Sequence, residues 1–396
     1  MSLPPAVILA AGESSRFWPL STHGHKSLHR LAGKAIIEYT VESLAQAGID
    51  RIIVVQSPIA RAAHFPHRTI ADQLGDGSSF GATIQYIDQP EAVGQGDAVL
   101  RAARLLDGEV LVVQPENINA GEIVTELLKQ PGDAIAVHER EDTWLFGVAA
   151  VDGDRLAGFV EKPEAGKEPS RYCNMGVWKL TPDYVETLKD VPADPLSNIT
   201  ALLARASRGE VGYVVTKHPF FPLKYPWHLF AMAQYLTKGK PYLGENVEVA
   251  DSASVGRGCV VEADAIIGPN VTLKECLIGA GSRIDSWLAQ TIVGADVLVE
   301  PDTVIEHTAL EGGRISVDVK GHQVVAELSK LGAAIGQGSV LKSGARVAPG
   351  VLIGAEATVT AGRPVTTNVP DRAGSVTKRK KQAGILRSRS AGARGM

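Results

Sequence analysis

Two basic residues, Arg16 and Lys26, follow an apolar run closely enough to face the same polyphosphate. Residues 6–11, Ala-Val-Ile-Leu-Ala-Ala, have the length and the β-branched content of a buried strand. Gly12 interrupts this run, and the short polar segment 13–15 leads to Arg16. Backbone N–H groups of such a loop, a planar guanidinium and a mobile ammonium all suit phosphate oxygens. We therefore predict a phosphate-binding loop, with an ordinary strand-to-helix turn as the alternative.

Other polar residues could complete a site for a phosphorylated substrate. Glu116 follows the apolar run 109–114, and a carboxylate at the end of a buried strand suits a hard cation with oxygen ligands. Glu161 and Lys162 come further along, followed by Asn174. Taken alone, Glu161-Lys162-Pro163 is typical of a charged surface turn.

The elements that must position these residues alternate between helical and strand patterns. The pattern predicts strands at 51–55, 83–87 and 109–114 and helices at 38–47 and 99–106, the first of which stops at Gly48. Such alternation predicts an α/β fold with a Rossmann-like, mostly parallel sheet covered by helices on both faces. Ligands then lie at the carboxyl ends of the strands.

Beyond residue 240 the pattern changes to a six-residue repeat of aliphatic side chains. The repeat comprises Val249, Val255, Val261, Ile267 and Leu273, then Ile335, Leu341, Val347, Ile353, Val359 and Val365. Hexapeptide repeats are typical of a β-helix, in which each aliphatic residue points inward from one side of a triangular coil. The irregular span 306–331 predicts an excursion that contains a hairpin near 314–322.

Composition adds a basic tail and three unpaired cysteines. We divide the chain into residues 1–240, a left-handed β-helix at 241–370 and a disordered basic tail at 371–396. Eight basic residues and no acid follow Asp371, so 32 basic groups face 44 acidic groups in residues 1–371. The tail is typical of a solvated segment, although it could attract an acidic surface. Cys173, Cys259 and Cys276 lack C-x-x-C spacing, which indicates buried thiols.

The phosphate loop belongs to a longer motif. Gly12-x-x-x-Arg16-Phe-x-Pro-Leu, Lys26, Gly33-Lys34 and Ile37-Glu38-Tyr39 together resemble the N-terminal signature of the sugar-phosphate nucleotidylyltransferases. The motifs Phe-Val-Glu-Lys-Pro at 159–163 and Asn-Met-Gly-Val-Trp at 174–178 match the same family. Hexapeptide repeats after such a domain resemble the archaeal bifunctional sugar-1-phosphate nucleotidylyltransferase/acetyltransferases. Ser14 and His25 depart from the pattern, since they replace a glycine and a proline of the signature.

The resemblance implies a role for each matching residue. Arg16, Lys26 and Lys162 would be catalytic, with Lys162 holding the sugar phosphate. Glu161, Asn174 and Gly147 would contact the sugar. The residues that would bind the nucleotide are Ala10, Ala11, Gly12, Glu13, Ser14, Ser15, Gln89, Gly94, Gly96 and Asp97. Gly94 and Gly96 would let a flat base approach the backbone, although a plain loop before a helix is the alternative.

Two departures concern the metal. Glu116 and His228 stand where the family has aspartates that bind a divalent cation. Mg²⁺ is implied by the resemblance, but histidine favours softer ions such as Mn²⁺ or Co²⁺. His228 could equally be a solvated loop residue.

The implied reaction joins a nucleoside triphosphate, UTP or dTTP first, to a hexose 1-phosphate and releases pyrophosphate. We expect a cytoplasmic homo-oligomer, a trimer through the β-helix, with neither membrane nor nucleic-acid partners. Two alternatives remain: a catalytically impaired relative that binds nucleotide and regulates or scaffolds a partner, and a β-helix acyltransferase. The acyltransferase motif lacks its histidine at residues 284–294, and His307 and His322 are the nearest candidates.

Overall fold

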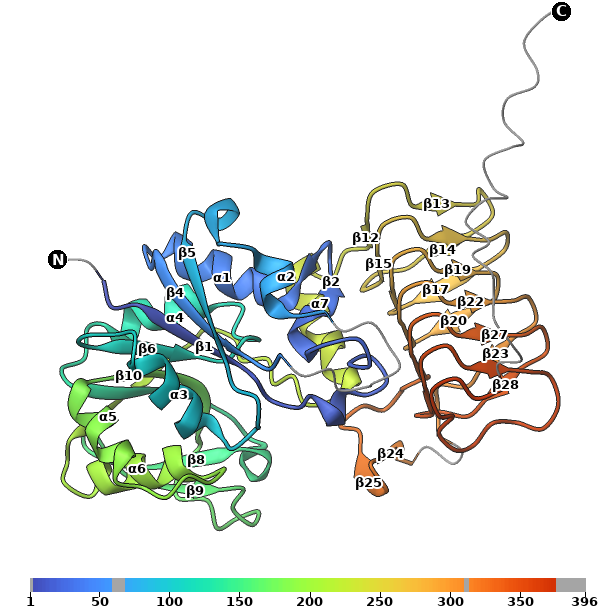
Figure 1. The fold of residues 1–396 in the computed structure, drawn as a ribbon. Helices are drawn as coiled ribbons and strands as arrows, with labels where there is room; N and C mark the ends of the chain where they lie inside the picture. Colours follow the sequence, from blue (N-terminus) through green and yellow to red (C-terminus); the bar gives the residue numbers. More distant parts are fainter. Residues whose placement is uncertain (1–2, 59–67, 310–312, 375–396) are drawn as a thin grey trace, which may run out of the picture.

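The computed structural model describes residues 3–58, 68–309 and 313–374, so most of the predicted basic tail lies outside the described residues. Figure 1 shows two parts that lie side by side: a sheet covered by helices, formed by the first half of the chain, and a stack of short strands formed by the second. A short hairpin extends from the second part toward the first.

The first part is built on a nine-stranded sheet with the order β5-β4-β1-β6-β10-β7-β11-β9-β8. Its strands are β1 Ala6–Ala10, β4 Arg51–Gln56, β5 Thr83–Asp88, β6 Val110–Val113, β7 Asp133–Glu139, β8 Gly147–Asp152, β9 Arg155–Glu161, β10 Tyr172–Leu180 and β11 Val211–Val215. Every residue of β1 and β6 is buried, as the continuous apolar runs of the sequence predict.

Helices cover both faces of this sheet. They are α1 Ile36–Gln46, α2 Ile70–Leu74, α3 Gln95–Ala103, α4 Ala120–Leu127, α5 Pro182–Lys189, α6 Ser197–Ala206 and α7 Leu229–Thr237. Helices α1 and α4 pack into one apolar core, and α3, α5 and α6 pack into the core on the opposite face. The alternating side chains of β1 divide between these two cores, because successive residues of a strand point to opposite faces.

The sheet is mixed rather than mostly parallel. Strands β5, β4, β1 and β6 run parallel, as predicted, and β11 runs parallel to β7. However, β10 is antiparallel to both β6 and β7, and β8 and β9 form an antiparallel pair. The prediction rested on the strand–helix alternation of residues 35–110. The later strands β8 and β9 are joined by a tight turn, and such a connection makes an antiparallel pair.

The second part is a coil of two- and three-residue strands stacked in parallel. Its strands are β12 Tyr242–Leu243, β13 Glu248–Val249, β14 Ser254–Val255, β15 Val260–Val261, β16 Ile266–Ile267, β17 Thr272–Lys274, β18 Leu277–Ile278, β19 Arg283–Ile284, β20 Leu288–Ala289, β21 Ile292–Val293, β22 Leu298–Val299, β23 Val304–Ile305, β26 Ala334–Ile335, β27 Val340–Leu341, β28 Arg346–Val347, β29 Leu352–Ile353 and β30 Thr358–Val359. Two six-stranded sheets form two sides of the coil, and shorter sheets form the third. All eleven predicted repeat residues pack into one apolar core inside it.

The coil also continues between the two runs of the repeat, in residues 274–305, where the six-residue period is lost. Tyr242 pairs with Val260, Val260 with Leu277, and Leu277 with Ile292, so successive turns of the coil take 18, 17 and 15 residues. Shorter connections between the strands interrupt the six-residue repeat in the sequence, but the strands remain stacked. The sequence pattern missed this stretch because it tested a fixed period.

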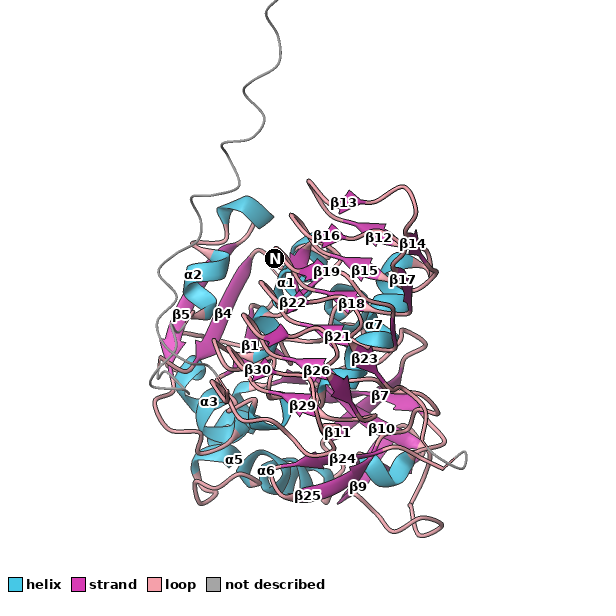
Figure 2. Cartoon of the chain, turned by 90° about the vertical axis from the view of Figure 1, so that its right-hand side faces the viewer, coloured by secondary structure: helices cyan, strands magenta, loops and turns pink. Residues whose placement is uncertain are grey.

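The predicted hairpin is present as β24 Ser316–Val319 and β25 His322–Val325, which pair antiparallel. It leaves the stack after β23 and returns before β26, and Figure 2 shows it at the edge of the coil. Val317 and Val319 are buried in an apolar cluster that also contains Trp227 and Phe230 of the first part. One continuous apolar interface therefore joins the hairpin, the coil and the first part.

The coil extends slightly beyond its predicted end at residue 370. Asp371 accepts hydrogen bonds from the Trp18 indole at 3.1 Å and from the Ala355 N–H at 2.7 Å. Arg372 forms an ion pair with Glu356 at 2.9 Å. Residues 371–374 thus pack on the coil, although they carry the composition of the tail.

Among the described residues, no helix is long and apolar enough to cross a membrane.

Candidate functional site

The predicted phosphate loop follows β1 directly. Ala10 and Ala11 are buried at the end of the strand, whereas Gly12 and Glu13 are exposed. Ser15–Phe17 then form a single 3-10 turn that carries Arg16. The parallel strands β1, β4, β5 and β6 end at one edge of the sheet, so the loop lies beside the segments that follow β5 and β6.

The backbone conformation at Ser14 shows why the family signature has a glycine at this position. Its backbone lies in the left-handed region, with φ 54° and ψ 16°, which costs a residue with a side chain roughly 1–2 kcal/mol. Its side chain offsets part of this cost, because Ser14 Oγ accepts a hydrogen bond from the Lys26 N–H at 3.0 Å. Ser21 Oγ also donates to the Ser14 carbonyl at 2.9 Å. The substitution thus ties the phosphate loop to the segment that carries Lys26.

Lys26 begins a second 3-10 turn, Lys26–Leu28, and His25 caps it. His25 Nδ1 accepts from the Ser27 N–H at 3.2 Å, and its φ of −64° is one that proline also adopts. The ammonium of Lys26 lies 2.5 Å from Glu116 Oε1 and donates to the Leu223 carbonyl at 2.9 Å. The structure therefore brings the predicted lysine and the predicted carboxylate into direct contact.

Lys224 also belongs to the site, although it was not among the predicted site residues. Its ammonium donates to the Leu145 carbonyl at 2.9 Å and lies 4.8 Å from the centre of the Phe146 ring. Burial, together with the positive charges of Lys162 and Arg16, lowers the pKa of Lys224 to about 8. Lys224 begins the segment Lys-Tyr-Pro-Trp-His at 224–228, of which only the last residue, His228, was predicted to have a role.

Arg16, Lys162 and Lys224 line one cavity of about 530 Å³. Lys162 reaches it because its backbone has a φ of 48° and its N–H is held by the Phe146 carbonyl at 2.9 Å. Arg140 also lines the cavity, and Asp142 binds its guanidinium through two contacts of 2.7 Å. The like charges that line this cavity repel one another, and an anion bound between them would offset the repulsion. The cavity is therefore suited to a phosphorylated ligand.

In the loop after β5, the residues predicted to bind the nucleotide have close neighbours within the protein. Gln89 is buried, and its side-chain amide donates to the Gly94 carbonyl at 3.0 Å and to Asp97 at 2.8 Å. A Cβ on Gly94 would lie 2.7 Å from the Asp194 carbonyl oxygen, and one on Gly96 would meet the Ser197 hydroxyl. Both glycines thus permit close packing of α3 against the start of α6, so their absence of a side chain is explained without a nucleotide base.

Asp97 belongs to this internal network as well. Burial would raise the pKa of Asp97, but the hydrogen bonds from Arg101 and Gln89 outweigh it and hold the pKa below its usual value. Arg101 Nε lies 2.6 Å from Asp97 Oδ2. A carboxylate held in this way stays ionised and orients Gln89 at the carboxyl edge of β5.

The predicted sugar contacts Gly147, Glu161 and Asn174 lie on β8, β9 and β10, and none of them is among the described residues that line the cavity. Gly147 opens β8 opposite Glu161, and a Cβ there would collide with the Phe159 ring and lie 2.8 Å from Glu161 Oε2. Asn174 Oδ1 accepts from the Gly176 N–H and from the Trp178 indole, each at 2.9 Å. These bonds fix a bulge in β10 and commit the oxygen of Asn174, so only its amide group can serve a ligand.

Glu116 and His228, the two predicted metal ligands, each have a contact within the protein. Glu116 Oε2 is buried without a hydrogen-bond partner, which suits a cation, and Oε1 binds Lys26. His228 Nδ1 accepts from the Lys224 N–H at 3.1 Å, and burial lowers the pKa of this histidine to about 4. The described residues contain no group of three histidine, cysteine or acidic side chains that could hold a metal ion alone. Mg²⁺ is often held by one or two carboxylates together with substrate phosphates, so the metal site stays a prediction.

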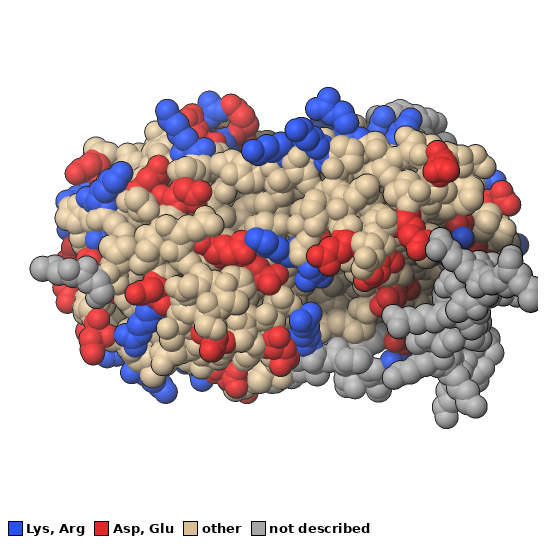
Figure 3. Space-filling view, turned by 90° about the horizontal axis from the view of Figure 1, so that it is seen from above, with Lys and Arg blue, Asp and Glu red and all other residues tan. Residues whose placement is uncertain are grey.

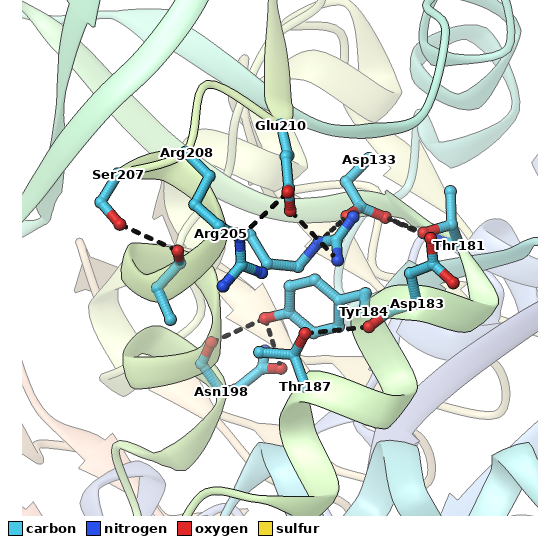
Figure 4. Close-up of polar contacts among 11 residues, drawn as sticks. Asp133, Thr181, Asp183, Tyr184, Thr187, Asn198, Arg205, Ser207, Arg208 and Glu210 are labelled. Carbon is cyan, nitrogen blue, oxygen red and sulfur yellow. Dashed lines mark hydrogen bonds and ion pairs between the residues drawn. The ribbon is translucent and has the colours of Figure 1, made fainter.

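A second charged cluster lies apart from the cavity, and its charged groups are paired within the protein. Asp133, which is completely buried, pairs with Arg205 and accepts from Thr181 Oγ1 at 2.8 Å (Figure 4). Tyr184 lies beside this pair, and its hydroxyl donates to the Asn198 carbonyl at 2.7 Å. These contacts join β7 to α5 and α6, and their role is structural.

Charged side chains of both signs lie on the face of the molecule seen from above (Figure 3). Basic and acidic side chains are interspersed over the face drawn in Figure 3, and no single-sign stripe crosses it. The basic segment after residue 374 lies outside the described residues.

Comparison with known proteins decides the family. A nucleotidyl transferase family model matches residues 5–216, more than half of the chain. The chain belongs to the nucleotidyl transferase family. Nucleotidyl transferases generally use a divalent metal such as Mg²⁺. The match covers β1 to β11 and therefore the phosphate loop, Lys26, Glu116 and Lys162.

Relatives of this nucleotidyltransferase extend over both parts of the chain. The bifunctional protein GlmU of Methanococcus maripaludis is 24% identical over 89% of this chain and 92% of its own length. The bifunctional sugar-1-phosphate nucleotidylyltransferase/acetyltransferase of Sulfurisphaera tokodaii is 23% identical over 92% of this chain and 98% of its own. The low-salt glycan biosynthesis nucleotidyltransferase Agl11 of Haloferax volcanii is 27% identical over 83% of this chain and 93% of its own length.

A solved structure of a UDP-glucose pyrophosphorylase complexed with UDP-glucose is similar in fold to the first part. It has a TM-score of 0.50 and 20% sequence identity, and the match covers 60% of this chain and 99% of that one. The family, the relatives and the fold together identify the chain as a nucleotidyltransferase enzyme.

Proposed function

We propose that this enzyme transfers a nucleotidyl group from a nucleoside triphosphate to a sugar 1-phosphate. The observation that carries the proposal is the convergence of Arg16, Lys162 and Lys224 on one cavity next to the Lys26–Glu116 pair. The names of the relatives, which include a sugar-1-phosphate nucleotidylyltransferase, support the same reaction.

In the proposed reaction, an oxygen of the sugar phosphate attacks the α-phosphorus of the triphosphate. The new P–O bond forms as the bond to the β-phosphate oxygen breaks, and pyrophosphate leaves with that electron pair. No protein nucleophile is needed. Catalysis would come from positioning two anions against each other and from neutralising the charge that builds up between them.

Each cation then has a place in this reaction. The loop 12–15 and Arg16 would bind the triphosphate, Lys26 would move from Glu116 to the reacting phosphate, and Lys162 and Lys224 would hold the sugar phosphate. Glu161 and the amide of Asn174 would bind sugar hydroxyls, and Gln89 would face the base. A hexose 1-phosphate with UTP or dTTP is the first pair to test.

The architecture belongs to the proposal as well. We infer a transfer domain at 1–240 and a left-handed β-helix from 241 to about 374, and the parallel pairing of its short strands supports this. We also expect the β-helix to assemble into a trimer. Val304 and Leu243 on the coil are 43% and 49% exposed, and such apolar edges favour contact with another copy. Light scattering of the purified protein would measure its mass.

The test is pyrophosphate release across a matrix of nucleoside triphosphates and sugar 1-phosphates. Each pair is assayed with Mg²⁺, Mn²⁺ or Co²⁺ and also with a chelator, because the metal is a prediction. Release that needs both substrates supports the proposal. Nucleotide binding without release under any condition would favour the impaired, regulatory relative.

One observation favours testing acyl transfer as well. The rings of His307 and Trp287 are tilted against each other, with 5.3 Å between their centres. His307 also lines a hollow of about 320 Å³ with Lys274 and Lys330. Burial and both lysines lower the pKa of His307, so the ring stays neutral and can accept a proton. His322 lies exposed on the hairpin instead. Consumption of acyl-CoA by the wild type, lost in His307→Ala, would reveal a second reaction.

A further inference from the structure

The hairpin β24–β25 places a lysine of the second part of the chain on the phosphate loop of the first part. A turn of two residues, Lys320-Gly321, joins the two strands of the hairpin. The ammonium of Lys320 donates to the hydroxyl of Ser15 on the loop 12–15, with 3.2 Å between Nζ and Oγ. A basic side chain 305 positions further along the chain therefore lies beside the loop that is proposed to bind the triphosphate.

The turn holds Lys320 in a conformation that lysine seldom adopts. Lys320 and Gly321 have φ values of 58° and 81°, and a tight turn between twisted strands requires positive φ at both residues. Asparagine is favoured before glycine in such turns, because it tolerates the left-handed region better than most residues with a side chain. The local backbone preference therefore does not explain a lysine at this position.

Contacts along the hairpin fix its position against the loop. Asn368, near the end of the coil, donates to the Asp318 carbonyl at 2.8 Å. Val317 and Val319 are buried in the same apolar cluster as Phe17, which follows the loop. Packing along the hairpin thus sets the place of its turn, and the contact between the lysine and the loop is one consequence.

The positive charge of Lys320 has no ion-pair partner in the part of the chain that the structure describes. Lys320 lines a cavity of about 540 Å³ between the loop and the hairpin, and it is the one basic residue among the described residues that do so. Glu13, Asp318 and Asp371 line the same cavity, yet none of them forms an ion pair with this ammonium. Asp371 instead accepts hydrogen bonds from two N–H groups of the protein. The ammonium contacts a neutral hydroxyl, so its charge is available to an anion bound at the loop.

This side of the loop is separate from the side at which the sugar phosphate is proposed to bind. Arg16 lines the cation-rich cavity with Lys162 and Lys224, whereas Ser15 and Lys320 line the other cavity, and the two share none of their described lining residues. In the proposed reaction the sugar phosphate attacks from the cation-rich cavity. The attacking and leaving oxygens lie roughly in line on the phosphorus, so pyrophosphate leaves on the side away from that cavity.

We propose that Lys320 binds the phosphates of the nucleoside triphosphate that leave as pyrophosphate, so that both parts of the chain build one triphosphate site. The inference rests on the proposed transfer reaction and adds a residue of the second part to it. The ammonium would move from the Ser15 hydroxyl to a phosphate oxygen, and the hydroxyl could then donate to the same phosphate chain. An ammonium in this place would stabilise the negative charge of the departing group.

The experiment compares three variants of the full chain with the wild type. Lys320→Asn removes the charge but suits the left-handed turn, and Lys320→Arg keeps the charge. Lys238→Asn is the matched control. Lys238 is an exposed lysine with a φ of 53°, and it lines neither cavity.

Steady-state kinetics are measured in both directions with the substrate pair that the pyrophosphate assay identifies. Lys320→Asn should raise the KM for the triphosphate, and the KM for pyrophosphate in the reverse reaction, by about tenfold, which is typical of a lost hydrogen bond to a charged group. The KM values for the sugar 1-phosphate and the nucleotide sugar should not change. Lys320→Arg and Lys238→Asn should resemble the wild type.

A purely structural role for the turn predicts a different result. Asparagine would then be at least as active as lysine, because it suits the backbone of the turn. Wild-type KM values for triphosphate and pyrophosphate in Lys320→Asn would therefore overturn the inference. Equal rises in the KM of all four substrates would also overturn it, since they would indicate a distorted loop. Both results leave the transfer reaction itself intact.

A binding measurement tests Lys320 without any turnover. Inorganic tripolyphosphate carries the phosphate chain alone, and calorimetry measures its affinity for the same four proteins. Binding that is about tenfold weaker in Lys320→Asn, and unchanged in Lys320→Arg and Lys238→Asn, would support the site even if no substrate pair reacted. Equal binding by all four proteins, or no binding by the wild type, would refute it.

Discussion

Two clusters of charged side chains in the nucleotidyl transferase part differ in how their charges are balanced. Around Asp133, the carboxylate is completely buried and Arg205 and Thr181 satisfy it. Around the cavity, Arg16, Lys162 and Lys224 face the same space, and burial together with the repulsion from Lys162 and Arg16 lowers the pKa of Lys224. A balanced cluster stabilises the fold, whereas a cluster with surplus charge is suited to a ligand of opposite charge.

The largest expected effect lies in the balanced cluster. Asp133→Ala leaves the Arg205 guanidinium buried without its main partner, so the free energy of unfolding should fall by about 3–5 kcal/mol. Urea unfolding followed by circular dichroism measures this change. Asp154→Ala is the control, because that carboxylate is 90% exposed and should change stability by less than about 0.5 kcal/mol. Equal stability of the two variants would contradict a structural role for Asp133.

Lys26→Ala should instead affect turnover most. Loss of an ammonium that stabilises a reacting phosphate should reduce kcat by about 10²–10³-fold or more. The variant also leaves the buried Glu116 carboxylate without its partner, so the urea midpoint should fall as well. Lys34→Ala removes an exposed lysine of the same segment and should keep full activity. Full turnover by Lys26→Ala would remove this lysine from the proposed mechanism.

The charge of Lys224 should make acceptor binding depend on pH. Its pKa in the folded protein, about 8, is lower than the ordinary value of 10.5, so the lysine loses its proton as the pH rises through 8. The KM for the sugar phosphate should therefore rise by about tenfold between pH 7 and pH 9, if only the charged form binds the phosphate.

The same shift fixes the sign of the stability effect. The unfolded chain binds this proton more tightly than the folded protein does, so stability should rise with pH between about 8 and 10.5. In Lys224→Arg the side chain stays charged, and the rise in KM should disappear. A pH profile identical in Lys224→Arg and the wild type would assign the dependence to another group.

The smallest effect is expected at Ser14. Ser14→Gly relieves the left-handed backbone but loses the hydrogen bond to the Lys26 N–H, and these contributions, each about 1 kcal/mol, oppose each other. Ser14→Ala keeps the strain and loses the bond, so it should destabilise the protein by about 1 kcal/mol relative to the wild type. Thermal unfolding of the three proteins gives the order. A Ser14→Ala protein as stable as the wild type would show that the hydroxyl contributes nothing.

Local patterns in the sequence predicted much of the fold. The apolar runs at β1, β4 and β6 are buried strands, and the aliphatic repeat of the second part forms the interior of the coil. Strand and coil interiors follow from periodicity, because a side chain's direction depends on its position in the repeat. Pairing partners are not local. The antiparallel insertion of β10 and the shortened turns of the coil were missed for this reason.

The candidate site divides in the same way. The sequence identified Arg16, Lys26, Glu116 and Lys162 by residue type and motif, and the structure brings the lysine of one motif onto the carboxylate of another. It could not show that Gly94 and Gly96 face α6, or that the oxygen of Asn174 is committed to its own strand. Those facts depend on which segments pack together.

The sequence by itself determined the kinds of groups present: a phosphate loop, its cations, and an aliphatic repeat that must bury one side of a coil. Only the tertiary structure decided what surrounds them. It placed Lys224 beside Arg16 and Lys162, occupied His228 with a backbone N–H, and set the hairpin against the cavity. Charge, burial and the availability of a lone pair depend on neighbours distant in the chain, and residue types alone do not specify those neighbours.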